Sequence, residues 1–165
     1  MIRSATPDDE SALRRLDLET WSSVSSPAPP PPPDRPFDID GVLVAELADG
    51  IAGYVKLGPV LPIPASAHVL EIKGLSVSPA HRRRGVARAL LHAALAQARV
   101  AGACRVTLRV LAHNQAARDL YTACGFEIEG VLRGFFRLDG RYVDDVLMAL
   151  PLSTDRPARS RRARP

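Results

Sequence analysis

The segment Gly74–Leu91, GLSVSPAHRRRGVARALL, constrains the fold most, because it joins an apolar strand to an amphipathic helix through a basic turn. Gly85 lets the backbone bend, so that successive N–H groups converge at the helix N-terminus, where the macrodipole favours negative charge. The segment predicts an α/β domain with an anion-binding turn for a pyrophosphate; the alternative is a solvated basic surface. Four arginines crowd the turn: Arg82, Arg83, Arg84 and Arg88.

Charge elsewhere in the chain makes this turn more distinctive. The 165 residues carry a net charge of +4, which alone would suggest a nucleic-acid binder. The last fifteen residues, however, hold five arginines and one aspartate, and this segment accounts for the whole excess. We therefore expect residues 151–165 to form a basic, disordered tail behind a neutral domain. Nucleic-acid binding would rest on that tail, which lacks interleaved aromatic residues, and is not favoured.

Cysteine and histidine usage excludes several other classes of protein. Cys104 and Cys124 form no CxxC pair and no regular framework, so we expect a reduced, intracellular protein with both cysteines in the core. The four histidines lack metal-ligand spacing, so no metal site is expected. No leader and no apolar run long enough to cross a membrane is evident, and a cytoplasmic location is the default expectation.

Hydrophobic periodicity predicts a mixed α/β sheet with helices on its faces. Helices are expected after Thr6, Gly85 and Asn114, each of which is a suitable residue for a helix N-terminus. Gly74, inside a long strand, predicts a bulge or a close approach by another backbone or a ligand. The expected strands cover residues 2–5, 42–46, 51–57, 68–77, 105–110, 126–129, 132–138 and 142–150.

Residues 22–36, SSVSSPAPPPPPDRP, interrupt this pattern with seven prolines in ten residues. Neither a helix nor a strand ladder tolerates such a density of proline, so an extended surface loop is predicted. Two interpretations stay open, a passive insertion and a loop that shapes a substrate site.

Two blocks of residues resemble the GNAT family of N-acetyltransferases. Arg82, Gly85 and Ala87 match the family's acyl-CoA motif, Arg or Gln, two residues, Gly, one residue, Gly or Ala, preceded by the strand LSV and Pro79. The resemblance extends from Ile2 to Leu150, and residues 129–150 are similar to the branch that acetylates amino acids, small amines or protein N-termini. The second block consists of Asn114, Ala117, Leu120, Tyr121 and the pair Gly125-Phe126.

The resemblance implies one GNAT domain, residues 1–150, with residues 22–36 as a loop within it. Its fold would be a mixed, mostly antiparallel central sheet flanked by helices, with a splayed, bulged strand at the acyl-CoA site. Acetyl-CoA would be the cosubstrate, and main-chain groups of residues 75–77 would hold its pantetheine arm and the oxyanion. The implied donor-site residues are Leu75, Ser76, Val77, Arg82, Arg83, Arg84, Gly85, Val86, Ala87, Arg88, Asn114 and Tyr121.

Transfer of an acetyl group to an amine also requires acid and base groups. Tyr121 matches the family's general acid, which protonates the CoA sulfur, although an aromatic residue there also fills space. Glu71 is our candidate base because it interrupts an apolar strand; an outward-facing, ion-pairing residue is equally compatible. Asn114 either caps a helix or holds a water or the CoA arm. Asp144 and Asp145 could attract a cationic acceptor, although hairpin acids are usually solvated.

These residues favour an acetyl-CoA-dependent N-acetyltransferase acting on a primary amine. The alternatives are a noncatalytic acyl-CoA-binding module of the same fold and a nucleic-acid-associated protein with a basic tail. Direct transfer is favoured over a cysteine acyl-enzyme, because no histidine is placed to activate either cysteine. A homodimer is possible and no membrane partner is expected. The acceptor stays unidentified, because the segment that selects it in the family is here the proline run.

Overall fold

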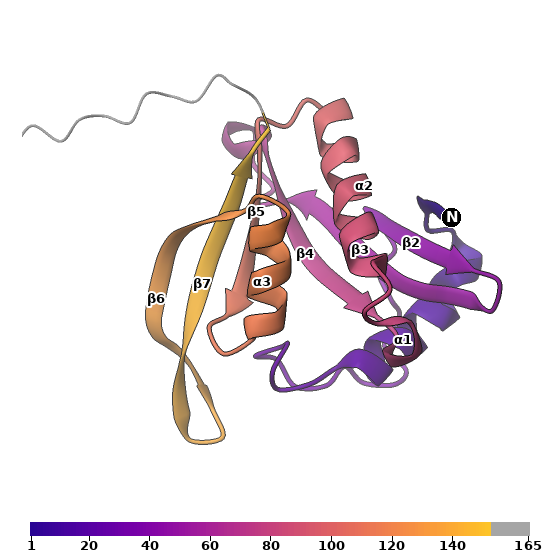
Figure 1. The fold of residues 1–165 in the computed structure, drawn as a ribbon, viewed down its shortest axis with the longest axis horizontal. Coiled ribbons are helices and arrows are strands. Elements are labelled where there is room, and N and C mark those ends of the chain that lie inside the picture. Colours follow the sequence, from indigo (N-terminus) through magenta and orange to yellow (C-terminus); the bar gives the residue numbers. More distant parts are fainter. Residues whose placement is uncertain (153–165) are drawn as a thin grey trace, which may run out of the picture.

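The computed structural model describes residues 1–152, which fold around one seven-stranded sheet (Figure 1). Its strand order is β1-β2-β3-β4-β5-β7-β6, and every neighbouring pair is antiparallel except β4 and β5. The predicted mixed, mostly antiparallel sheet is therefore confirmed. The strands are β1 (Ile2–Ser4), β2 (Val42–Leu47), β3 (Gly50–Pro59), β4 (Val69–Val77), β5 (Arg105–Leu111), β6 (Glu127–Leu138) and β7 (Arg141–Pro151), and the α-helices are α1 (Glu10–Thr20), α2 (Val86–Val100) and α3 (Gln115–Ala123).

Helix α1 covers one face of the sheet at its β2–β3 end. The predicted start at Thr6 takes the form of a single 3-10 turn, Pro7–Asp9, followed directly by α1. The Asp9 carboxylate accepts hydrogen bonds from the Thr6 N–H and hydroxyl at 2.8 and 3.0 Å. Leu13 and Leu16 of α1 are buried against β2 and Tyr54 of β3 in a compact apolar cluster. This cluster fixes α1 beneath the sheet.

Helices α2 and α3 cover the opposite face (Figure 1). The amphipathic helix predicted after Gly85 is present, and its apolar face buries Leu90, Leu91 and Ala94 against the sheet. Each fully buried leucine contributes about 1.5–3 kcal/mol of hydrophobic stabilisation. Tyr121 of α3 joins the same core. Both helices pack on one continuous core. The N-terminus of α2 therefore lies near β4, and α3 lies near β5, on the same face of the sheet (Figure 1).

Strand β4 departs from regular pairing on both of its edges. Toward β3, the register shifts between the pairs Lys56–Gly74 and Leu57–Ile72, so Lys73 is the extra residue of a bulge. The sequence predicted this irregularity at Gly74. The Tyr54 ring lies 3.5 Å from the position that a Cβ would take at Gly74. Toward β5, pairing stops at Ile72, and the two strands diverge toward their C-terminal ends (Figure 1). The predicted splayed strand is present.

Two expectations were wrong. The segments predicted as separate strands, 126–129 and 132–138, form one strand, β6, whose pairing with β7 shifts register twice. Bulges let this strand bend without ending; at one of them the Gly134 N–H donates to the Asp144 carboxylate at 2.7 Å. Cys104 is exposed instead of lying in the core, and both cysteines are free thiols.

The end of the described chain continues the sheet. Pro151 ends β7, and the Leu152 N–H donates to the Cys104 carbonyl at 2.8 Å, so hydrogen-bonded main chain extends two residues past the predicted start of the tail. The rest of the predicted tail, residues 153–165, lies outside the described residues. Among the helices of residues 1–152, none is long and apolar enough to span a membrane.

Candidate active site

The basic turn adopts the geometry that its sequence predicts. Gly85 is the N-cap of α2 and has a left-handed backbone, with φ +82°. The first hydrogen bond of the helix runs from the Ala89 N–H to the Gly85 carbonyl at 3.0 Å. The N–H groups of residues 86–88 therefore have no acceptor within the helix and are available to an anion. Arg83 is also left-handed, with φ 61°, which nothing in the sequence indicated.

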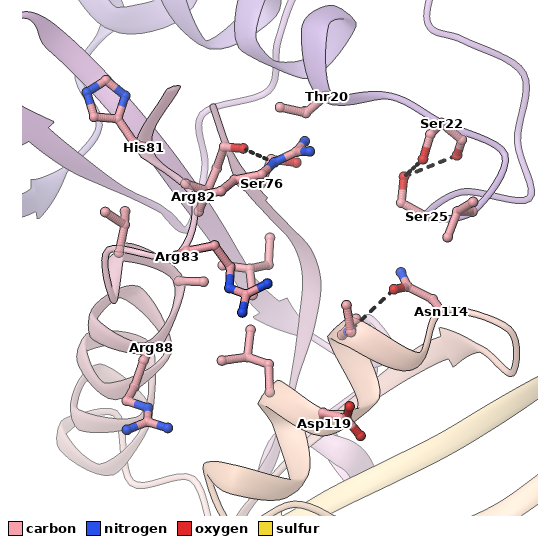
Figure 2. A pocket seen from close by; sticks show the side chains of 18 of the residues that line it. Thr20, Ser22, Ser25, Ser76, His81, Arg82, Arg83, Arg88, Asn114 and Asp119 are labelled. Carbon is pink, nitrogen blue, oxygen red and sulfur yellow. Dashed lines mark hydrogen bonds between the residues drawn. The ribbon is translucent and has the colours of Figure 1, made fainter. Parts of the chain in front are cut away.

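This turn forms one wall of a cavity of about 770 Å³, a size typical of small-molecule sites (Figure 2). The second wall is the C-terminal half of β4, and the third is the first two turns of α3. Most of the predicted donor-site residues line it: Leu75, Ser76, Val77, Arg82, Arg83, Gly85, Val86, Ala87, Arg88 and Asn114.

The cavity is strongly cationic. Figure 2 shows the guanidinium groups of Arg83 and Arg88 in the space between α2 and α3, while Arg82 lies over β4 and its Nε donates to the Val77 carbonyl at 3.2 Å. No carboxylate of residues 1–152 forms an ion pair with these three arginines. The one acid on the wall, Asp119, accepts a hydrogen bond from Gln115 at 2.6 Å. Uncompensated positive charge beside free helix N–H groups suits a polyanionic ligand.

The divergence of β4 and β5 supplies the remaining polar surface. Since β5 pairs with β4 only as far as Ile72, no strand covers that edge of residues 73–77 in the described chain. Main-chain groups on an uncovered edge can hydrogen-bond an extended ligand as a neighbouring strand would. The edge leads directly from the anion-binding turn to the point where the strands part.

Helix α3 begins at the cavity, and its N-cap combines two possible roles. The Asn114 side-chain carbonyl accepts a hydrogen bond from the Ala117 N–H at 3.2 Å (Figure 2). Helix capping, one of the two roles considered for Asn114, is therefore present, and the same residue lines the cavity. The amide N–H₂ of Asn114 makes no hydrogen bond within residues 1–152 and remains available to a ligand or water.

The start of the proline-rich loop contributes to the lining of the cavity. Ser22, Val24 and Ser25 line it together with Thr20 at the end of α1. The loop is tied down across the cavity, because Nε2 of His113 lies 3.2 Å from the Ser23 carbonyl oxygen. Of residues 22–36, only Ser22, Val24 and Ser25 line the cavity, and both interpretations of the loop stay open. The sequence carried no signal for this contact, which joins residues ninety positions apart.

Tyr121 does not line the cavity. Its side chain is only 8% exposed and packs edge-on against Phe126, with ring centroids 5.9 Å apart. Burial raises the pKa of Tyr121 to about 12, and the neighbouring Cys124 adds to the shift. Burial also raises the pKa of the Cys124 thiol, with the Arg88 charge acting in the opposite direction. The phenol is therefore fully protonated near neutral pH, and within residues 1–152 its hydroxyl has no hydrogen-bond partner.

Two further predicted residues also lie outside the cavity. Glu71 is half-buried on β4, opposite Thr107 of β5, one pair before the strands part. It projects from the face of the sheet that α2 and α3 do not cover, and it forms no ion pair within the described chain. Arg84 lies on the far side of the turn, in a smaller pocket of about 190 Å³ next to β1 and β2.

An ion pair that the sequence did not indicate lies just beyond the parting of the strands. We expected Asp145 to be a solvated hairpin acid, but its side chain is only 3% exposed and pairs with Arg109 of β5. Arg109 Nε donates to Asp145 Oδ2 at 2.6 Å. The neighbouring Asp144 is also engaged, through the Gly134 N–H. Only tertiary structure could reveal the pair, because the two residues are 36 positions apart.

Comparison with known proteins identifies the family. A model of the acetyltransferase (GNAT) family matches residues 11–126, which include the turn, the diverging strands and α3. The chain belongs to the GNAT family. The predicted family is thus confirmed, and with it the acetyltransferase activity and the acetyl-CoA cosubstrate.

Individual GNAT relatives differ in how much of the chain they share. The chain is 30% identical over 160 residues to the L-amino acid N-acetyltransferase AaaT of Escherichia coli, covering 90% of this chain and 96% of the relative. It is 37% identical over 99 residues to N-acetyltransferase 8F1 of Rattus norvegicus, but this covers 59% of the chain and only 45% of the rat protein. The chain therefore spans less than half the length of that relative.

Solved structures confirm the fold. The smu.2055 protein of Streptococcus mutans superimposes with a TM-score of 0.84 at 29% identity, covering 93% of this chain and 99% of that one. YncA from Salmonella typhimurium, solved with its cofactor acetyl-CoA, gives a TM-score of 0.81 at 22% identity, covering 97% and 98%. The bound molecule in that GNAT structure is the predicted cosubstrate.

Proposed function

We propose that this GNAT protein transfers the acetyl group of acetyl-CoA directly to a primary amine of an amino acid, a small amine or a protein N-terminus. The domain would comprise residues 1–150, with the proline-rich loop as part of its site. A cytoplasmic location agrees with the free cysteines, and the dimer stays a possibility.

The observation that carries the proposal is the continuity of the donor cavity. Free N–H groups at the start of α2 and three unpaired arginines can bind the pyrophosphate. The uncovered edge of β4 then offers main-chain groups to the pantetheine arm and to the oxyanion at residues 75–77. A donor held in this way would present its thioester where β4 and β5 part.

The chemistry needs one base and one acid. Glu71, directly or through water, would remove a proton from the ammonium group, because only a neutral amine can attack. The amine nitrogen then bonds to the acetyl carbon to give a tetrahedral oxyanion, the carbon–sulfur bond breaks as this intermediate collapses, and the nitrogen releases its second proton to water. Tyr121 would give its proton to the departing thiolate; its raised pKa keeps the phenol protonated near neutral pH and also makes it a weaker acid than an exposed tyrosine. No acyl-enzyme is required.

A thiol-release assay with mass analysis of the products tests the proposal. Acetyl-CoA is offered with α-amino acids, polyamines and short peptides with free N-termini, and acetyl-CoA binding is measured separately by calorimetry. We expect tight binding and turnover of at least one amine class. Tight binding without turnover of any amine would instead support a noncatalytic acyl-CoA-binding module.

A further inference from the structure

Arg109 occupies a special position in the sheet. The last pair between β4 and β5 joins Ile72 to Leu108, so Arg109 is the first residue of β5 after the strands part. Val106, Leu108 and Val110 are buried beneath α2 and α3. Because side chains alternate along a strand, Arg109 projects from the opposite face, the one that also carries Glu71. It therefore borders the gap between the strands from the side opposite the donor cavity.

Asp145 holds the guanidinium of Arg109 in place but accepts from only some of its N–H donors. Nε and Nη2 both face Oδ2 of the buried Asp145, and the guanidinium carbon lies 5.1 Å from the centre of the Phe135 ring. A guanidinium carries five N–H donors in one plane. Those of Nη1 and the outward one of Nη2 have no acceptor within residues 1–152, and the side chain is 42% exposed. The free edge has the fork geometry that binds a carboxylate through two parallel hydrogen bonds.

Together with Arg109, the carboxylate of Glu71 forms a site suited to a zwitterion. Glu71 of β4 pairs with Thr107 of β5, and Thr107 lies two residues before Arg109. Glu71 and Arg109 therefore project from the same face of the sheet. Strand spacing and rise place the two backbone positions roughly 8 Å apart. Two side chains of this length can converge on one small molecule, with the carboxylate of Glu71 toward an ammonium group and the fork of Arg109 toward a carboxylate.

We propose that Arg109, positioned by Asp145, binds the carboxylate of the acceptor and so selects free α-amino acids over polyamines and peptide N-termini. This inference rests on the proposed acetyl transfer and names its acceptor class. Asp145 is a positioning residue: it neutralises part of the charge and holds the planar group at the mouth of the gap. A polyamine or a peptide N-terminus offers Arg109 no carboxylate next to the reacting amine.

The test compares an α-amino acid with its own carboxamide, which keeps the amine and removes the negative charge. For the wild type we expect kcat/KM for the amino acid to exceed that for the carboxamide by at least about tenfold, the size of a charge-assisted hydrogen bond. In Arg109→Gln the ratio should fall by about the same factor. Comparing ratios between variants cancels the difference in amine basicity between the two acceptors.

The chain contains a matched control. Arg105 lies four residues earlier on the same face of β5 and also forms an ion pair, with Glu129 of β6, but it sits where β4 and β5 are still paired. Arg105→Gln should leave the acceptor ratio unchanged. Because Arg109→Gln leaves Asp145 buried without its partner, the double variant Arg109→Gln with Asp145→Asn is measured as well. Acetyl-CoA affinity reports on folding of every variant.

Each outcome has a definite meaning. An acceptor ratio near one in the wild type, or turnover of polyamines or peptides but of no amino acid, overturns the role of Arg109 while acetyl transfer stands. A ratio that persists in the single and double variants also overturns it. Turnover of no amine at all overturns the proposed function, and the acceptor assignment falls with it.

Discussion

Replacing Gly85 with glutamate separates backbone strain from charge, because α2 has a matched glycine at its other end. Gly85 precedes the helix with φ +82°, and Gly102 follows it with φ +76°. No heavy atom lies within 4 Å of the position that a Cβ would take at either glycine. Glutamate at each site therefore meets open space and the same conformational penalty, about 1–2 kcal/mol for a left-handed non-glycine residue.

Gly85→Glu should unfold at a higher temperature than Gly102→Glu but bind acetyl-CoA more weakly. Interaction with the helix macrodipole stabilises Gly85→Glu and destabilises Gly102→Glu by about 0.3–1 kcal/mol each, so Gly85→Glu should be the more stable variant. A carboxylate roughly 6 Å from the bound pyrophosphate, however, is repelled by about 0.7–2.8 kcal/mol for effective dielectric constants between 80 and 20. Acetyl-CoA affinity should therefore fall about 3- to 100-fold in Gly85→Glu and stay unchanged in Gly102→Glu.

Calorimetric titration with acetyl-CoA and thermal unfolding of both variants measure the two effects. Gly85→Ala, which carries strain without charge, shows how much of the loss comes from the backbone alone. Equal acetyl-CoA affinity in Gly85→Glu and Gly102→Glu would refute the reasoning, because the N-terminus of α2 would then not be the phosphate site. A loss that shrinks at high salt would confirm its electrostatic origin.

Three further substitutions test other parts of the molecule. Tyr121→Phe should lower kcat by about 10²-fold or more and leave acetyl-CoA affinity and Tm nearly unchanged, since its hydroxyl has no hydrogen-bond partner within residues 1–152; an unchanged kcat would leave Tyr121 a packing residue. Asp9→Asn should lower Tm at pH 7, because the Arg3 guanidinium holds the pKa of Asp9 well below its usual range. The difference in Tm between Asp9→Asn and the wild type should shrink below about pH 4, because Asp9 of the unfolded wild-type chain then becomes protonated while folded Asp9 stays ionised. A difference in Tm that does not change with pH would contradict this assignment. Asn114→Ser keeps a helix cap, so a weakened acetyl-CoA affinity at constant Tm would assign the Asn114 amide to the donor and an unchanged affinity would limit it to capping.

The geometry of the candidate donor site could be predicted from the sequence because its determinants are local. A left-handed glycine, the free N–H groups that follow it and nearby arginines all lie between Arg82 and Arg88, in the turn before α2 and its first residues. Gly74 likewise predicted the irregularity of its strand, which the structure shows as a register shift next to it. Such features follow from the covalent order of a few residues, and no distant contact can rearrange them.

The surroundings of the proposed catalytic and acceptor-binding residues could not be predicted in this way. The family resemblance suggested Tyr121 as the acid, and an acid within an apolar strand suggested Glu71 as the base. Only the packed structure shows that Tyr121 is buried outside the cavity lining and that Glu71 lies on the opposite face of the sheet. Hairpin acids are usually solvated, and that expectation failed for Asp145 because Arg109 reaches it from the neighbouring strand.

The family, the α/β fold and the backbone geometry of the basic turn thus followed from the order of the amino acids. The tertiary structure was needed to show which residues border the gap between β4 and β5, that Ser22, Val24 and Ser25 line the cavity, and where a buried carboxylate pairs with a guanidinium. The difference lies in the range of the interactions. Backbone conformation and helix capping act over a few residues, whereas strand register and side-chain pairing join positions that are distant along the chain.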